Sequence, residues 1–198
     1  MFKKYIYSYI VLPAVLITGC MSSAVAEEVN LYTARKEHLM RPLIDIFQNE
    51  TGIQVNILTA KTKELIKKIL DEGENSPADL LITVDAGNLN DAKLKNISQT
   101  IDSKLLNQLV PENLRDIDGH WYGLSIRSRV IMYNPTAISP KEIMKYENLA
   151  DDGLAGRVCI RSSSNIYNQS LLASLIYHNG EEAALSWAKG VVKNFSRE

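Results

Sequence analysis

Alternation of short apolar strands with amphipathic helices over residues 29–85 constrains the fold most strongly. "EVNLYTA", "IQVNIL" and "ADLLITVD" have the length and composition of strands. Between them, "LMRPLIDIFQNETG" and "KELIKKILDEG" place apolar residues at helical spacing and end in glycine. "ADLLITVD" is almost continuously apolar, which is typical of a parallel strand covered on both faces. The order β-α-β-α-β therefore predicts an α/β unit with right-handed crossovers.

The rest of the chain continues with both kinds of element. Polar helical stretches run to about residue 114, and three further strands are predicted at "HWYGLSI", "RVIMYN" and "RVCIR". "YNQSLLASLIYHNG" and "EEAALSWAKGVVKNF" predict two helices joined at Gly180. A change in composition near Asn134 and Pro135 indicates a second lobe. We therefore expect a first α/β lobe over residues 27–128 and a partial second α/β lobe over residues 129–198.

The N-terminus has the pattern of a secretory signal over residues 1–26, because Lys3 and Lys4 precede an apolar stretch and then small residues. Two cleavage sites are compatible with it. "LITGC" resembles a bacterial lipobox, which would make Cys20 the lipidated first residue of the mature protein. "AVA" at residues 24–26 would instead release a soluble protein. Both alternatives predict export to the periplasm or cell envelope, and a membrane attachment only through the lipid of Cys20.

Charge and motifs exclude several classes of function. The formal net charge of −1 gives no electrostatic attraction for nucleic acid. The sequence contains no H-E-x-x-H, G-x-S-x-G, Walker A or C-x-x-C motif. Since no nucleophile stands beside a base, we do not expect an enzyme. Cys159, the second of the two cysteines, is interpreted as a small buried strand residue.

Four loops follow predicted strands, at the edge of an open α/β sheet where ligands bind. A single cleft could collect all four. The serines of the last loop have two open interpretations, helix capping and anion binding. The loops and their polar residues are "YTARKEH" with Tyr32, Arg35 and Lys36; "VDAGN" with Asp85 and Asn88; "SIRSR" with Arg127 and Arg129; and "RSSSNIY" with Ser162, Ser163, Ser164, Asn165 and Tyr167.

Longer segments resemble a known family. "SPADLL", "RSRVIMYN" and "SSNIYNQSL", in this order, closely resemble the periplasmic iron(III)-binding proteins. These are the substrate-binding components of ABC-type ferric iron importers, and the resemblance runs from about Val29 to the last residue. It implies a two-lobed, hinge-closing type II periplasmic binding protein, similar to bacterial transferrins. It also implies a monomer whose partners are the permease and ATPase subunits of the importer.

The resemblance implies a ferric iron site. Fe³⁺ is a hard cation that prefers anionic oxygen ligands, and a phenolate is such a ligand once the metal has displaced its proton. The family tyrosine in "NIYNQSL" is a metal ligand, and Tyr167 matches it. Asp85 stands in the loop where certain relatives have a carboxylate ligand. Lys36 stands where many members have a histidine, and a protonated lysine cannot bind the metal.

The resemblance also implies an anion that is bound together with the metal. Some relatives bind carbonate through arginine, and a guanidinium offers a bidentate fork to a planar oxyanion. Arg35, Arg127 and Ser163 are the candidates here.

The sequence departs from the family in its length. Members continue well past "KNFSR" and carry an adjacent tyrosine pair that is absent here. The expectation is therefore a chain truncated within its second lobe, with weaker iron binding. The alternatives are a binding protein of the same fold for another small anion, and a gene remnant without activity. The preference between ferric and ferrous iron stays open.

Overall fold

Three parallel strands form the only sheet among residues 27–196, which are the residues that the computed structural model describes. The strand order is β2-β1-β3, so β1 lies in the centre. It pairs with β2 from Glu28 opposite Gln54 to Thr33 opposite Thr59, and with β3 over three residues from Leu31 opposite Leu80. The predicted β-α-β-α-β order is confirmed by β1 (Glu28–Thr33), α1 (Glu37–Thr51), β2 (Gln54–Thr59), α2 (Thr62–Glu72) and β3 (Leu80–Ile82).

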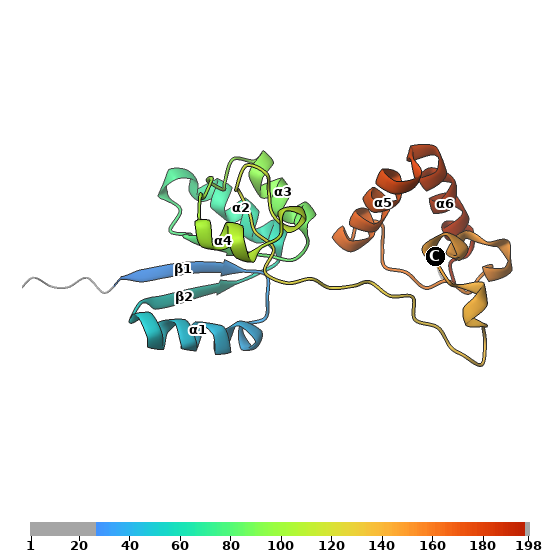
Figure 1. Cartoon of the computed structure of the whole chain (residues 1–198), viewed down its shortest axis with the longest axis horizontal. Coiled ribbons are helices and arrows are strands. Elements are labelled where there is room, and N and C mark those ends of the chain that lie inside the picture. The colour runs from blue at the N-terminus through green and yellow to red at the C-terminus, as the bar shows by residue number, and fades with distance from the viewer. Residues whose placement is uncertain (1–26, 197–198) are drawn as a thin grey trace, which may run out of the picture.

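Helices cover both faces of this sheet (Figure 1), with α1 on one side and α2 on the other. Leu65 of α2 is completely buried, and Leu31 of β1 is 3% exposed. The helix α1 ends at Gly52, whose φ of 74° lies in the left-handed region that glycine adopts without strain. Four further short helices complete this part of the chain: η1 (Gly73–Asn75), α3 (Ala86–Leu94), α4 (Lys104–Leu109) and η2 (Glu112–Leu114).

We call residues 27–123 the first lobe, residues 124–134 the connecting segment and residues 135–196 the second lobe. The connecting segment runs as an extended chain between the two lobes (Figure 1). The predicted lobe boundary between residues 128 and 129 falls inside it. Its even-numbered apolar residues point away from the protein and are strongly exposed: Leu124 73%, Ile126 75%, Val130 69% and Met132 90%.

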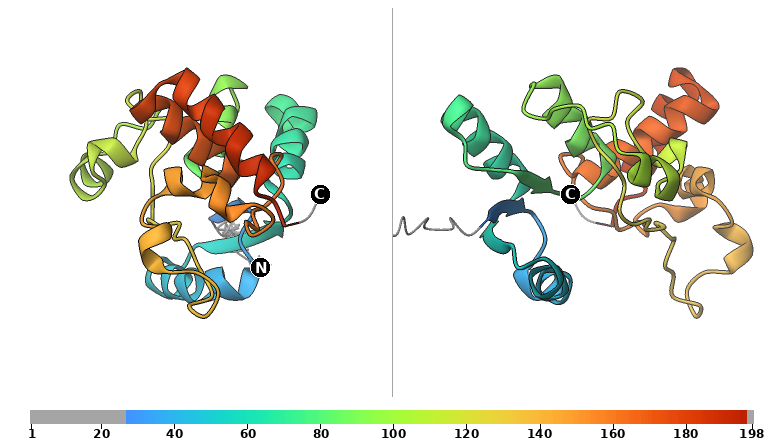
Figure 2. Two further views of the ribbon diagram at one scale, coloured as in Figure 1. Left: turned by 90° about the vertical axis from the view of Figure 1, so that its right-hand side faces the viewer. Right: turned by 60° about the vertical axis from the view of Figure 1, so that its left-hand side comes forward.

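The second lobe is built from helices in the part of the chain that the structure describes. The helices α5 (Ile166–Asn179) and α6 (Glu181–Lys193) pack on each other beside a series of short turns (Figure 2). Ile143, Leu154, Val158 and Val191 form its buried core. These turns are the short 3-10 helices η3 (Pro140–Glu142), η4 (Tyr146–Ala150) and η5 (Asp152–Leu154).

The three later strand predictions are wrong. Residues 120–126, 129–134 and 157–161 contain no strand, and only single bridges form, from Arg115 to Tyr122 and from Val158 to Phe195. A strand is stabilised by the ladder it makes with a neighbour, and these extended segments have no neighbouring strand within the described residues. Cys159 is exposed rather than buried, which corrects that interpretation as well.

The predicted signal segment and its Cys20 lie outside the described residues. Within residues 27–196, none of the helices combines the length and apolar character that crossing a membrane requires.

Candidate functional site

Tyr167 is the second residue of α5 and lies at the entrance of that helix. The side chain of Asn165 caps the helix, because its Oδ1 accepts a hydrogen bond from the Tyr167 backbone N–H at 3.1 Å. The tyrosine side chain is half-buried. A capped first turn fixes the backbone of Tyr167, so its ring is presented from a rigid position at the junction of loop and helix.

Three guanidinium groups surround the Tyr167 ring. The Cζ of Arg127 lies 4.5 Å from the ring centroid, and those of Arg129 and Arg161 lie 5.8 Å from it. The first two arginines come from the connecting segment and the third from the loop before α5. None of them forms an ion pair with an acidic residue of the described chain. We call these residues the arginine cluster, and its three uncompensated charges favour an anionic group beside Tyr167.

Asn168 ties this cluster to α5. Its Oδ1 accepts a hydrogen bond from the Arg129 guanidinium at 2.7 Å. Its Nδ2 donates to the backbone carbonyls of Arg161 and of Ser162, the latter at 3.2 Å. One side chain therefore joins the connecting segment, the loop before α5 and the helix itself.

The serine loop is partly folded on itself. The hydroxyls of Ser162 and Ser164 lie 2.9 Å apart, and the Ser162 hydroxyl accepts a hydrogen bond from the Ser164 backbone N–H. Asn165 rather than a serine caps α5. The Ser163 side chain is exposed, and its hydroxyl forms no hydrogen bond within residues 27–196. Ser163 thus has the freedom that its predicted anion-binding role needs, and that role stays a prediction.

Asp85 joins the two lobes. It precedes α3 and accepts a hydrogen bond from the Gly87 backbone N–H at 2.9 Å. The same oxygen, Oδ1, accepts one from the Ser170 hydroxyl of α5 at 2.7 Å. Beside this bond, a Cβ on Gly87 would lie only 3.1 Å from the Ile166 side chain, so the start of α3 fits closely against α5. Asp85 therefore contacts α5 at Ser170, about one helical turn after Tyr167. Its role as a metal ligand stays a prediction.

The model of the family described as bacterial extracellular solute-binding protein matches residues 75–197. The chain belongs to this family. Iron uptake protein A1 of Synechocystis sp. is 48% identical to it over 172 residues, which are 87% of this chain and 48% of that protein. The Fe(3+)-binding periplasmic protein of Serratia marcescens is 28% identical over 182 residues, 91% of this chain and 53% of that protein. The solute-binding protein thus spans about half the length of the curated relatives it matches.

Solved structures of relatives have the same fold. A Trichodesmium protein (IdiA, FutA) in complex with iron and citrate ligands matches with a TM-score of 0.81 and 48% identity over 86% of this chain and 54% of that one. The ferric binding protein of Campylobacter jejuni matches with a TM-score of 0.80 and 40% identity over the same shares of the two chains. These likenesses confirm the predicted α/β, two-lobed architecture of the periplasmic binding proteins.

The first predicted loop of this solute-binding protein is not part of the arginine cluster. Tyr32 is 5% exposed, and its hydroxyl donates to the Glu72 carboxylate at 3.1 Å. Burial raises the pKa of Tyr32, and the bond to Glu72 raises it further. Arg35 follows β1, and its guanidinium is not among those that contact Tyr167. The anion-binding role of Arg35 therefore stays a prediction, and Lys36 is an exposed residue immediately before α1.

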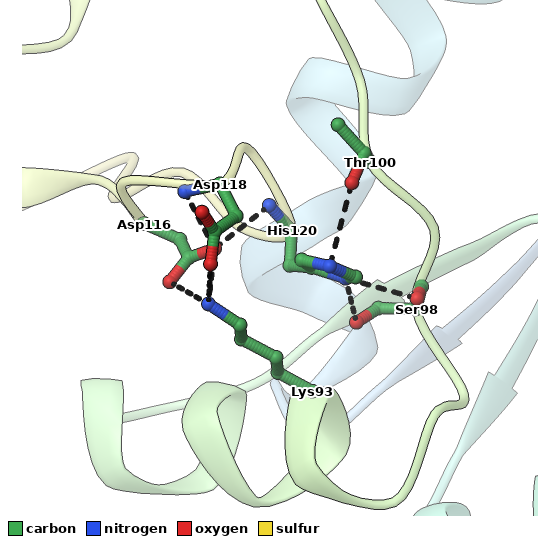
Figure 3. Close-up of polar contacts among 6 residues, drawn as sticks. All are labelled: Lys93, Ser98, Thr100, Asp116, Asp118 and His120. Atoms are coloured by element: carbon green, nitrogen blue, oxygen red, sulfur yellow. Dashed lines mark hydrogen bonds and ion pairs between the residues drawn. The ribbon is translucent and has the colours of Figure 1, made fainter.

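Carboxylates elsewhere in the described residues do not form a metal site, since no three His, Cys, Asp or Glu side chains of residues 27–196 converge. The most prominent polar cluster contains a cation (Figure 3). The Lys93 Nζ lies 2.9 Å from Oδ1 of Asp116 and 2.7 Å from Oδ2 of Asp118, so its single positive charge bridges the two carboxylates and offsets one of their two negative charges. His120 is held by Ser98, whose carbonyl oxygen lies 3.0 Å from its Nδ1. This cluster fixes a loop of the first lobe and leaves the Tyr167 site as the candidate.

Tyr167, Arg127 and Arg129 were candidates from the sequence and lie together in the structure, whereas Arg161 and Asn168 were not among the candidates. Arg161 is the last residue of "RVCIR" and has the pattern of an ordinary strand end. Asn168 acts through backbone carbonyls, for which no sequence pattern exists. The signal that could have indicated Arg161 is its position, six residues before Tyr167 and directly before the serine loop.

Proposed function

We propose that this solute-binding protein binds ferric iron, with the Tyr167 phenolate as one of its ligands. The observation that carries the proposal is the Tyr167 ring, fixed in the first turn of α5 and surrounded by three guanidiniums. Fe³⁺ favours anionic oxygen ligands, and a phenolate supplies one. The names of the relatives, an iron uptake protein and ferric-binding proteins, support the same cargo.

We further propose that an oxyanion is bound together with the metal. Arg127, Arg129 and Arg161 supply forked N–H donors, and Ser163 supplies a free hydroxyl at the same loop. Carbonate has the planar geometry that suits a guanidinium. The bound anion would compensate the charge of the arginine cluster and complete the oxygen ligands of the iron.

The role that follows from this chemistry is capture and delivery. The protein would hold iron between its lobes, close on it through contacts such as Asp85 with Ser170, and pass it to the permease and ATPase subunits of an ABC importer. It would act outside the cytoplasmic membrane, exported by the segment of residues 1–26, either free or anchored through Cys20. The family to which the chain belongs is described as solute-binding, which supports a binding role rather than a catalytic one.

Replacing Tyr167 with phenylalanine tests the proposal. A ferric phenolate absorbs visible light by charge transfer, so titration with ferric nitrilotriacetate should give a coloured complex. Tyr167→Phe should abolish this band and weaken iron binding by more than about 100-fold, the upper end of what the loss of an outer-shell partner costs. Tyr177→Phe is the matched control, because Tyr177 lies on the same helix and is 84% exposed. A Tyr167→Phe protein that keeps the colour and the affinity would remove the basis of the proposal.

The arginine cluster also favours a second candidate, a binding protein for a small anion without a metal. Calorimetric titration with carbonate, phosphate and citrate in the absence of iron separates the two candidates. Tight binding of one anion that survives Tyr167→Phe would favour the second, since a phenol hydroxyl contributes little to holding an oxyanion beside three guanidiniums.

A further inference from the structure

The side chain of Asn168 makes contacts that a helix of this kind does not need. Asn165 already caps α5, and Asn168 lies one residue after Tyr167. Its amide nonetheless makes three hydrogen bonds, all directed away from its own helix, to Arg129, Arg161 and Ser162. Such a side chain serves the neighbouring segments rather than the helix.

Two of these partners carry guanidiniums of the arginine cluster. The guanidinium of Arg129 is held directly, whereas Arg161 is held through its backbone carbonyl. Arg129 is also fixed at its own carbonyl, which accepts a hydrogen bond from the Tyr146 hydroxyl at 2.9 Å. Burial raises the pKa of Tyr146 although the Arg129 charge acts in the opposite direction, so this hydroxyl remains protonated and able to donate at neutral pH.

The cluster needs such a restraint. Three like charges around one ring repel each other, and a free arginine gains rotamer entropy by swinging into water. The neutral Asn168 restrains them without compensating their charge, whereas a carboxylate in its place would form an ion pair with Arg129. The charge of the cluster thus stays available to an anionic complex at Tyr167.

We propose that Asn168 is a positioning residue of the iron site, which holds Arg129 and Arg161 in place around Tyr167 and so determines how strongly the site retains its anionic complex. This inference rests on the proposed function. Asn168 does not contact the metal in this proposal and acts through the two arginines. Outer-shell partners of this kind typically change metal affinity by about 10- to 100-fold.

The experiment compares Asn168→Ala with Asn179→Ala. The control lies on the same helix, and its amide donates a hydrogen bond to Glu147, far along the helix from Tyr167. Two properties of the iron complex are measured: the rate of iron transfer to a competing chelator and the wavelength of the phenolate charge-transfer band. We expect Asn168→Ala to speed iron loss about tenfold. In the unchanged protein, positive charge beside the phenolate stabilises its electrons and raises the energy of the charge-transfer transition. Asn168→Ala lets that charge move away, so the band should move to longer wavelength. The control should change neither.

A double-mutant cycle with Arg129→Ala identifies the route of the effect. If Asn168 acts through Arg129, its replacement has a smaller effect once Arg129 is gone. Asn168→Asp, which keeps the acceptor for Arg129, is the second variant if the alanine protein does not fold. Its carboxylate pairs with Arg129 and withdraws that charge, so faster iron loss is again expected.

Iron retention and band position equal to those of the unchanged protein, in a folded variant, would overturn the inference. That result is distinguishable from failure of the proposed function. In the first case Tyr167→Phe still removes the band, whereas in the second either the unchanged protein shows no band or Tyr167→Phe keeps it.

Discussion

The two lobes differ in how their extended segments are stabilised. In the first lobe, β1 is paired with β2 over six residues and with β3 over three. In the second lobe, the extended residues 157–161 form only the single bridge of Val158 with Phe195 among the described residues. Both regions have apolar sequences suited to strands, so composition does not cause the difference. A strand forms where a partner strand is available, and the first lobe supplies such partners for β1 in β2 and β3.

The same contrast predicts that the lobes unfold separately. The first lobe has its own core around Leu65, and the second has a core around Val191. Trp121 belongs to the first lobe and Trp187 packs against the core of the second, so each tryptophan can report on one lobe. Single-tryptophan proteins, made with Trp121→Phe or Trp187→Phe, would provide this readout.

Leu65→Ala should have the largest effect. The side chain is completely buried, and its truncation should cost the first lobe about 3 kcal/mol of unfolding free energy. In urea titrations, the transition seen by Trp121 should move to lower urea while that seen by Trp187 stays in place. Equal shifts of both transitions would show that the lobes unfold as one unit.

Acidification should affect the first lobe through Asp116. Burial alone would raise the pKa of Asp116, but hydrogen bonds from Lys93 and from the His120 backbone N–H outweigh it and lower the pKa below its ordinary value. The carboxylate therefore stabilises the folded lobe above about pH 4, and this contribution is lost as the pH falls through the lowered pKa. In Asp116→Asn, the Trp121 transition should depend less on pH between about 5 and 2. An unchanged pH profile would argue against the ion pair with Lys93.

Ser170→Ala should have the smallest effect and acts between the lobes. It removes the hydrogen bond to Asp85, worth about 1 kcal/mol. The shift of the Trp187 urea transition that accompanies destabilisation of the first lobe should become smaller in Ser170→Ala. Ser174→Ala is the control, since Ser174 is one helical turn further along α5 and exposed. If both substitutions have the same effect on this shift, the contact of Asp85 with Ser170 does not join the lobes.

Local patterns were sufficient to predict much of the fold. Helical spacing and a terminal glycine identified α1, and an almost continuous apolar run identified β3. The strands predicted at 120–126, 129–134 and 157–161 failed because strand formation depends on a neighbour, which the pattern of a single segment does not contain.

The candidate site was predicted in part for a related reason. Tyr167 and Arg127 were expected to share a cleft because both follow predicted strands; they do lie together, although those strands are absent from the described residues, and their binding roles stay predictions. The restraint by Asn168 could not be predicted, because its partners include backbone carbonyls that every residue possesses. Asp85 was predicted as a metal ligand, which stays a prediction; its contact with the Ser170 hydroxyl of the second lobe was not predicted.

One side of the connecting segment carries exposed apolar residues, and the other carries arginines that contact Tyr167. The position of these arginines couples movement of the lobes to the candidate site. Three odd-numbered residues of the segment contact the second lobe, Arg127 and Arg129 at Tyr167 and Ile131 against the core. The only covalent link between the lobes within residues 27–196 is thus also a wall of the candidate site. A rotation of one lobe pulls on the same peptide that carries two of the three charges. Opening the protein and loosening its hold on a ligand would then be one movement, with no relay of intermediate side chains.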